Sequence, residues 1–422
     1  MYHKTVLKNG VRIISEPIPH LRSVSLGIWV NAGSRDEAPP ENGISHFIEH
    51  MIFKGTARRD AFRIAKELDA IGGMSNAFTG KEHTCFHAKV LDRHFDRLAD
   101  ILSDIFLNST FDDREMERER QVILQEISMV EDSPDDKIHV LFNRGFWRDH
   151  PIGRSILGTG ETVSAITREA IRDYMGRFYV PERVLVAAAG NVDHRSMVAF
   201  FEPLFESAFP SGRSAPPRKT PGVRPGASFH FKELEQVHLC LGGEAPSQKD
   251  EKRFACAAFN TLLGGNMSSR LFQEVREKRG LAYSVYSFVS SYADTGLLGV
   301  YLATDLGNVN LALEVVSGEI RKMIRGAVSP SDLEEAKEYL IGGLYLSSEN
   351  SDSRMMRTAK NEFIYGRYIP FEELVSRLEK VTVDDVVAVA RDVFREDRVS
   401  LTTLGPVSEA DVDRSCLAFD AW

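Results

Sequence analysis

The segment Glu41-Asn42-Gly43-Ile44-Ser45-His46-Phe47-Ile48-Glu49-His50-Met51 carries the most specific pattern in the chain. Its apolar residues recur at helical spacing, so we predict a buried or half-buried helix over 42–53. On such a helix His46 and His50 lie one turn apart on the same face, with Glu49 beside them. Two imidazoles at this spacing can bind one divalent ion, and zinc is the usual metal. The order His-x-x-Glu-His inverts the commoner His-Glu-x-x-His arrangement.

A zinc site that keeps one position for water needs a third protein ligand. The strongly helical run 115–127 offers Glu119 and Glu126, which are two turns apart and share a face. Glu126 is the better candidate because its neighbours at helical spacing are apolar, namely Val122, Ile123, Met129 and Val130. Glu119 suits an outer role, in which it orients a ligand or balances charge. The alternative for Glu126 is a solvated charge on the helix surface, which is what we expect for Glu115 and Glu117.

A proline-rich stretch divides the chain into halves of similar length. Five of the 17 prolines lie between Pro210 and Gly226, mixed with Gly, Ser, Arg and Lys, and such a segment is typical of a semi-rigid linker. We therefore predict an N-terminal, metal-binding domain over 1–209, a linker over 210–226 and a C-terminal domain over 227–422.

The two halves show the same order of expected elements: strands, a pair of helices, strands, a helical run and a last strand. This order predicts an α+β protein with two structurally similar domains, each a largely antiparallel sheet covered by helices. The expected strands are 5–7, 11–15, 24–30, 74–79, 84–90, 183–189, 228–231, 237–242, 283–289, 297–303 and 398–403. One expected helix covers 268–277.

Composition excludes several classes of protein. The chain has 422 residues, 43% of them hydrophobic, which is ample for a core and argues against intrinsic disorder. Its formal charge of −9 argues against a nucleic-acid binder. No apolar run approaches the ~18 residues of a membrane span, and no targeting segment is evident. The four cysteines show no metal-binding or redox spacing, so we expect free thiols and a cytoplasmic protein.

The sequence resembles the pitrilysin clan of zinc peptidases, and most closely its mitochondrial processing peptidase branch with the compact bacterial relatives. The resemblance rests on His46-Phe47-Ile48-Glu49-His50 with Glu119 and Glu126 beyond it, and on segments 30–35, 53–56, 72–73, 76–79, 157–159 and 189–192. It implies two α/β-roll domains and Zn²⁺ held by His46, His50 and Glu126. It also implies that Glu49 is the general base in peptide hydrolysis.

The same resemblance implies substrate contacts away from the metal. Asn76 and Ala77 match an edge-strand position that pairs with an extended or unfolded peptide. Arg276 and Tyr283 match an element that contacts the substrate and the developing oxyanion, although Arg276 could also be a solvated helix charge. In the family this element faces the metal from the other half of a clamshell chamber. For a chain of this size that half would be a second subunit, so we expect a homodimer.

Two other functions remain open at this point. Some relatives are non-catalytic subunits of larger assemblies, but the intact metal motif favours a zinc-dependent endopeptidase here. A metal-dependent hydrolase of non-peptide substrates is the third possibility, and the edge-strand segment argues against it.

Overall fold

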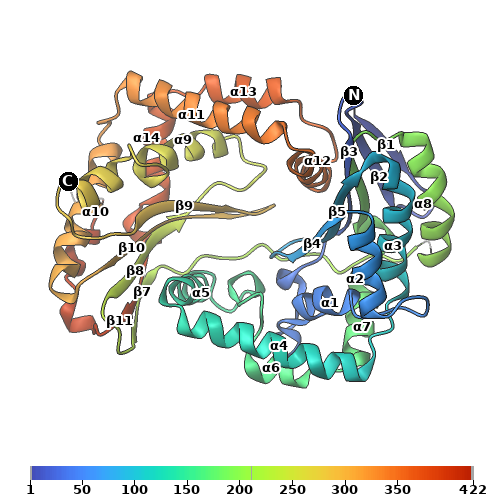
Figure 1. The fold of residues 1–422 in the computed structure, drawn as a ribbon. Helices are drawn as coiled ribbons and strands as arrows, with labels where there is room; N and C mark the ends of the chain where they lie inside the picture. The colour runs from blue at the N-terminus through green and yellow to red at the C-terminus, as the bar shows by residue number, and fades with distance from the viewer. Residues whose placement is uncertain (1, 211, 420–422) are drawn as a thin grey trace. The chain divides into compact units, whose positions relative to one another are not determined.

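The computed structural model describes residues 2–210 and 212–419, so residue 211 of the predicted linker and the chain-end residues 1 and 420–422 lie outside the described residues. The described residues form two compact units (Figure 1). The first unit is drawn from Met1–Met129, Arg154–Lys219 and Leu346–Ile369. The second is drawn from Val130–Gly153, Thr220–Tyr345 and Pro370–Trp422.

The first unit contains a six-stranded sheet of order β1-β2-β6-β3-β5-β4. Neighbouring strands are antiparallel except for the parallel pair β2 and β6. The central strand β3 is buried on both faces, which explains its nearly continuous apolar sequence. The strands are β1 (His3–Val6), β2 (Arg12–Pro17), β3 (Ser23–Val30), β4 (Met74–Thr79), β5 (Thr84–Leu91) and β6 (Val184–Gly190).

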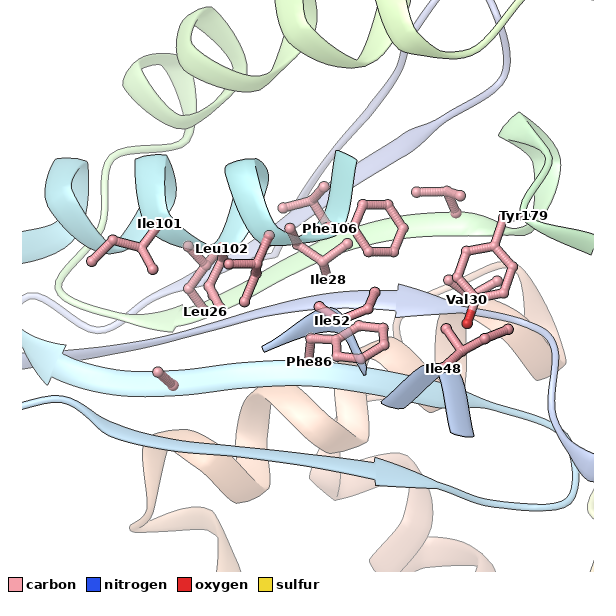
Figure 2. Packing of buried hydrophobic residues seen from close by; sticks show 14 of the residues in the cluster. Leu26, Ile28, Val30, Ile48, Ile52, Phe86, Ile101, Leu102, Phe106 and Tyr179 are labelled. Carbon is pink, nitrogen blue, oxygen red and sulfur yellow. The ribbon is translucent and has the colours of Figure 1, made fainter. Parts of the chain in front are cut away.

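One face of this sheet packs against helices to form the larger core of the unit. Figure 2 shows Leu26 and Ile28 of β3 near Leu102 and Phe106 of the helix above them, and Ile48 near Val30. The helices of this unit include α1 (Ile44–Ile52), α2 (Ala61–Ala70), α3 (Phe95–Asn108), α6 (Gly160–Ala165), α7 (Arg168–Phe178) and α8 (His194–Ala208), together with most of α4 (Asp113–Asp132). The metal motif therefore sits on a helix anchored in a hydrophobic core.

The second unit repeats this plan with one strand fewer. Its sheet has the order β7-β11-β8-β10-β9, which matches β2-β6-β3-β5-β4 position by position, including the one parallel pair. The strands are β7 (Gly226–Phe231), β8 (Val237–Glu244), β9 (Val285–Ser291), β10 (Gly296–Thr304) and β11 (Ser400–Gly405). Its helices include α9 (Arg253–Gly264), α10 (Val309–Ile324), α13 (Phe371–Glu379) and α14 (Val383–Val393), with most of α11 (Pro330–Ser348). The predicted α+β class with two similar sheet domains is confirmed.

The other face of each sheet is covered by a helix from the opposite half of the sequence. Helix α12 (Ser351–Tyr365) packs on β2, β3 and β6 of the first sheet (Figure 1). Its Met355 sulfur accepts a hydrogen bond from the Trp29 indole at 3.3 Å. Helix α5 (Pro134–Phe146) packs in the same way on β8 and β11, where its Phe142 and Phe146 are fully buried. The division of the chain into domains 1–209 and 227–422 therefore stays a prediction, because the compact units exchange these two segments.

The expected elements are present, with two local differences. The helix expected over 268–277 is π-helical over Phe272–Glu277. The strand expected over 283–289 begins only at Val285, and Tyr283 precedes it with 80% of its surface exposed. Among the described residues, no helix is both long and apolar enough to cross a membrane. All four cysteines are free thiols, as expected.

Candidate metal centre

Helix α1 presents its two histidines from a rigid base. Its apolar residues Ile44, Phe47, Ile48, Met51 and Ile52 are all fully buried, so they fix the rotation of the helix about its axis. The His46 and His50 rings leave the same side of α1 with their centroids 4.6 Å apart. The helix is two residues shorter at its N-terminus than predicted, and it begins after Gly43.

Helix α4 supplies the third donor. The Glu126 carboxylate lies 3.5 Å from His46 Nε2 through one oxygen and 3.6 Å from His50 Nε2 through the other. One donor atom from each of the three residues falls within 4.8 Å of the others. Tetrahedral zinc with bonds of about 2.0–2.2 Å holds its ligand atoms roughly 3.3–3.6 Å apart. The two distances from the Glu126 carboxylate to the imidazoles match this spacing, and a bound zinc ion would draw the three donor atoms, which lie within 4.8 Å of one another, closer together.

The surroundings of Glu126 differ from the expectation. Its side chain is 37% exposed, and its neighbours Val122 and Met129 are 41% and 70% exposed. Of the four apolar neighbours that the sequence analysis named, Ile123 alone is fully buried. The apolar pattern around Glu126 therefore did not mark a buried carboxylate. An exposed edge at this ligand would leave room for water and substrate to approach a metal ion.

Glu119 contacts a metal donor, His50, without being one of the three donors itself. Its carboxylate accepts a hydrogen bond from His50 Nδ1 at 3.0 Å, which directs the other ring nitrogen, Nε2, toward Glu126. The second Glu119 oxygen pairs with Lys54 Nζ at 2.6 Å. Burial would raise the pKa of Glu119, but the hydrogen bonds from His50 and Lys54 lower it. An ionised acceptor is thus kept beside His50.

The two histidines differ in their affinity for protons. Burial, reinforced by the neighbouring His50, lowers the pKa of His46 to about 4, so the imidazole is neutral and able to bind a metal at neutral pH. Burial would also lower the pKa of His50, but the Glu119 hydrogen bond and the surrounding carboxylates raise it. A divalent ion would replace the proton that these carboxylates attract to His50.

Glu49 belongs to α1, and its carboxylate faces the edge strand β4 at Thr79. One of its carboxylate oxygens is buried and has no hydrogen-bond partner among the described residues. Burial raises the pKa of Glu49, and hydrogen bonds from Thr79 on β4 partly oppose this effect. The charges of His50 and Glu126 also act on Glu49, so its carboxylate lies close to the metal donors.

Arg120 holds the two metal-site helices together. Its guanidinium lies over the Phe47 ring of α1, 5.3 Å from the ring centre, and donates to the carbonyl oxygens of Val163 and Ile166. Arg120 is thus one point at which α4, which carries Glu126, packs against α1, which carries the two histidines. The sequence analysis did not single out Arg120, because its position relative to Phe47 depends on how the two helices pack.

Asn76 and Ala77 lie on β4, the outer strand of the first sheet. They pair with His87 and Phe86 of β5 on one side only. The Asn76 side-chain oxygen accepts a hydrogen bond from the Ala77 backbone N–H at 2.9 Å. Strand β4 therefore has the unpaired edge that strand addition requires.

Arg276 and Tyr283 belong to the second unit and lie against each other there. The Arg276 guanidinium sits 4.5 Å from the centre of the Tyr283 ring and 4.8 Å from that of Phe272. The Tyr283 ring is largely exposed. The two residues thus form one surface element, and their role toward the metal centre stays a prediction.

Comparison with known proteins places the chain in a family. The family model described as insulinase (peptidase family M16) matches residues 12–160, and the model described as peptidase M16 inactive domain matches residues 165–340. A Bacillus subtilis protein named uncharacterized zinc protease is 42% identical over 397 residues, 94% of this chain and 97% of its own length. The chain belongs to peptidase family M16. A Mycobacterium leprae protein of the same description is 42% identical over 407 residues, 96% of this M16 chain and 91% of its own.

Solved structures of low sequence identity share the M16 fold. A protease from Helicobacter pylori superimposes with a TM-score of 0.89 at 22% identity, covering 96% of this chain and 99% of its own. A structure described as a peptidase M16 inactive domain from Pseudomonas fluorescens gives 0.88 at 20% identity, with coverage of 96% and 98%. The family models and the relatives of 42% identity confirm the family resemblance expected from the motif.

Proposed function

We propose that this M16 protein is a zinc-dependent endopeptidase that hydrolyses extended or unfolded peptides. The observation that carries the proposal is the position of the Glu126 carboxylate, which approaches the Nε2 atoms of both His46 and His50 at distances that suit one zinc ion. The relatives named zinc proteases support the same chemistry.

In the proposed reaction, zinc held by these three side chains would acidify a water molecule and polarise the scissile carbonyl. Glu49 accepts the proton of the attacking water at its carboxylate and returns it to the departing amine. A carboxylate that is partly desolvated is a stronger base than one in water, and burial gives Glu49 this property. Glu119 keeps the His50 ring in the orientation that metal binding requires.

We propose that the substrate adds as a strand to the free edge of β4. Backbone groups of Asn76 and Ala77 would pair with the peptide, which explains why an extended chain is the substrate class. A peptide carbonyl at Ala77 would replace the Asn76 side-chain oxygen as the partner of that N–H. Arg276 and Tyr283 would donate hydrogen bonds to the substrate and to the developing oxyanion.

The substitution Glu49→Gln tests the catalytic part of the proposal. It removes the base and leaves the three metal donors, so we expect wild-type zinc content and a loss of about 10²- to 10⁴-fold in kcat/KM on an unstructured peptide. Turnover of a fluorogenic peptide and elemental analysis of the purified protein are the two measurements. Glu115→Gln is the control and should keep full activity, because the partner of Glu115 on α4 is the exposed Arg118. Wild-type turnover by Glu49→Gln would exclude the mechanism.

We further propose that the protein acts as a homodimer in which Arg276 and Tyr283 complete the site of the other subunit, so that the substrate is enclosed in a clamshell chamber. Two variants can test this, because His50→Ala removes only the metal half and Arg276→Ala only the other half. Mixing the two inactive proteins should restore part of the activity. Mixed dimers, verified by affinity tags, that remain inactive would rule out the shared site.

We propose a cytoplasmic location and expect neither nucleic-acid nor membrane partners. The four free cysteines support a reducing compartment. Fractionation of the source cells with an antibody against the chain would test this part.

A further inference from the structure

Helix α1 lacks a side-chain cap of its own. Its N-cap residue is Gly43, which has no side chain to accept a hydrogen bond from the first turn. The N–H groups at the start of a helix have no partner within the helix, and leaving them buried without one is costly. Because Gly43 and Ser45 are both buried, the donors must be satisfied from elsewhere in the fold.

Glu37 supplies the missing acceptor from six residues upstream. One carboxylate oxygen accepts from the Gly43 N–H and from the Asn42 side-chain amide, each at 2.9 Å. The other accepts from the Ser45 N–H at 3.0 Å. Glu37 is 1% exposed, and in the described part of the chain it forms no ion pair. The hydrogen bonds of the carboxylate therefore all go to residues 42–45, at the start of α1.

The position of the carboxylate is energetically demanding, which argues against a chance contact. Burial raises the pKa of Glu37 to about 7, although the hydrogen bonds from Asn42, Gly43 and Ser45 lower it. A buried carboxyl that satisfies three donors at a helix N-terminus gains from the helix dipole as well as from the bonds. Lys81 is half-buried nearby. Loss of solvent around its amine lowers its pKa to about 8, and the charge of Glu37 opposes this shift.

The contact bears directly on the metal donors. Ser45 precedes His46, and its N–H is held by Glu37 while its hydroxyl hydrogen-bonds to Tyr174 at 2.9 Å. The first turn is thus clamped, and His50 follows one turn later on the same rigid helix. At the other end of the site, Glu119 orients His50, whereas His46 Nδ1 is buried with no hydrogen-bond partner among the described residues. The orientation of His46 consequently depends on the backbone to which it is attached.

We propose that Glu37 is a positioning residue of the metal centre, whose carboxylate fixes the first turn of α1 and thereby the direction of the His46 imidazole. This inference rests on the proposed zinc site. A residue with only a general folding role would change stability without changing the geometry at the metal, and this difference makes the two roles separable.

The test compares Glu37→Gln with Glu41→Gln in the full-length protein. Glu41 lies in the same loop but bonds to Ala38 and Arg177 instead of to α1, so it is a matched control. Zinc affinity is measured by competition with a chromophoric chelator, and ligand geometry by the visible absorption of the cobalt-substituted protein. We expect Glu37→Gln to weaken zinc binding by about 10- to 100-fold and to alter the cobalt spectrum. Glu41→Gln should match the wild type in both.

Two outcomes would overturn the inference: wild-type zinc affinity with an unchanged cobalt spectrum in Glu37→Gln, or equal losses in both variants. Should Glu37→Gln fail to fold, Glu37→Asp decides, since it keeps the charge but withdraws it by one methylene. It should bind zinc more weakly than Glu41→Gln, and equal affinity would again overturn the inference. Failure of the wild type to bind zinc would instead refute the proposed function, so the two failures are distinguishable.

Discussion

His83 in the first unit is a half-buried histidine that does not belong to the group of metal donors. It lies one residue before β5, with its ring stacked on Phe363 of α12 and the ring centres 5.0 Å apart. Among the described residues, the one group with metal-binding geometry is His46, His50 and Glu126. His83 is thus a structural histidine held in its neutral form.

This neutral form predicts acid sensitivity. Burial, with the charges of Arg218 and Lys360, lowers the pKa of His83 from 6.5 to about 3. Below pH 6.5 the unfolded chain binds a proton at this residue that the folded chain does not. The free energy of unfolding should therefore fall as the pH falls from 6.5 toward 3, by up to about 1.4 kcal/mol per pH unit from this group.

Urea denaturation of the metal-free protein at several pH values between 7.5 and 5 measures this slope. His83→Asn should make it shallower, whereas His20→Asn, at an exposed histidine, should leave it unchanged. Equal slopes for His83→Asn and the wild type would show that the burial of His83 does not control acid stability.

The sequence predicted the side chains of the metal centre because they share helical spacing. His46 and His50 follow from one helix, and Glu119 and Glu126 from another, so each pair needs only local geometry. The supporting residues did not follow in this way. Lys54, Arg120 and Glu37 act across the packing of separate segments, and a single sequence gives no distance between segments. Gly43 was the available signal, because a buried helix that starts at glycine needs an acceptor from another part of the chain.

At the scale of elements, the turn before α1 depends on close approach of the backbone. Gly43 has a positive φ of 97°, and a Cβ there would lie 2.7 Å from the Leu157 carbonyl oxygen. Gly72, after α2, also has a positive φ, but a Cβ there would meet no atom within 4 Å. A side chain at Gly72 would therefore meet backbone strain only, whereas one at Gly43 would meet both backbone strain and steric overlap.

Alanine substitution at the two glycines should therefore give different losses of stability. Gly72→Ala should cost about 1–2 kcal/mol, the penalty for an L-residue in the left-handed region. Gly43→Ala should cost about 1–3 kcal/mol more, because the loop at Leu157 must also move. Chemical denaturation of both variants gives the comparison. Equal losses of stability would mean that the loop at 157–158 moves aside without any cost in free energy.

The elements themselves could largely be predicted, since their apolar periods are strong. Strand β4 was expected over 74–79 and is found there. The helix expected over 268–277 is where prediction from local pattern failed, because the periodicity does not distinguish a π-helix from an α-helix. The start of β9 was missed because Tyr283 has the β-propensity of a strand residue but lies outside the pairing of β9 with β10.

At the scale of the whole molecule, neither half of the sequence contains a complete unit. The first sheet leaves Trp29, Ile14 and Leu185 to be covered by α12, which lies beyond residue 350. The second sheet leaves Tyr301, Cys240 and Leu404 to be covered by α5, which precedes residue 147. No pattern within one half reports this exchange, so the sequence analysis assigned each helix to its own half.

This exchange predicts that the halves fold only together. Residues 1–219 and 220–422 expressed separately should each lack a cooperative unfolding transition, because each exposes one apolar face of its sheet. Co-expression of the two fragments should give a complex with the near-ultraviolet circular dichroism of the intact chain. Cooperative unfolding of either fragment alone would contradict the prediction.

The reciprocal placement of α5 and α12 also has a consequence for ancestry. In each half of the sequence, one helix follows the longest helix of that half: α5 follows α4, and α12 follows α11. Each of these two helices packs on the sheet formed by the other half. Two identical half-length chains, each donating that helix to its neighbour, would generate the same pair of units by a two-fold swap. Joining such a swapped pair through a proline-rich tether would give the present chain, after which one copy could keep the metal ligands while the other lost them.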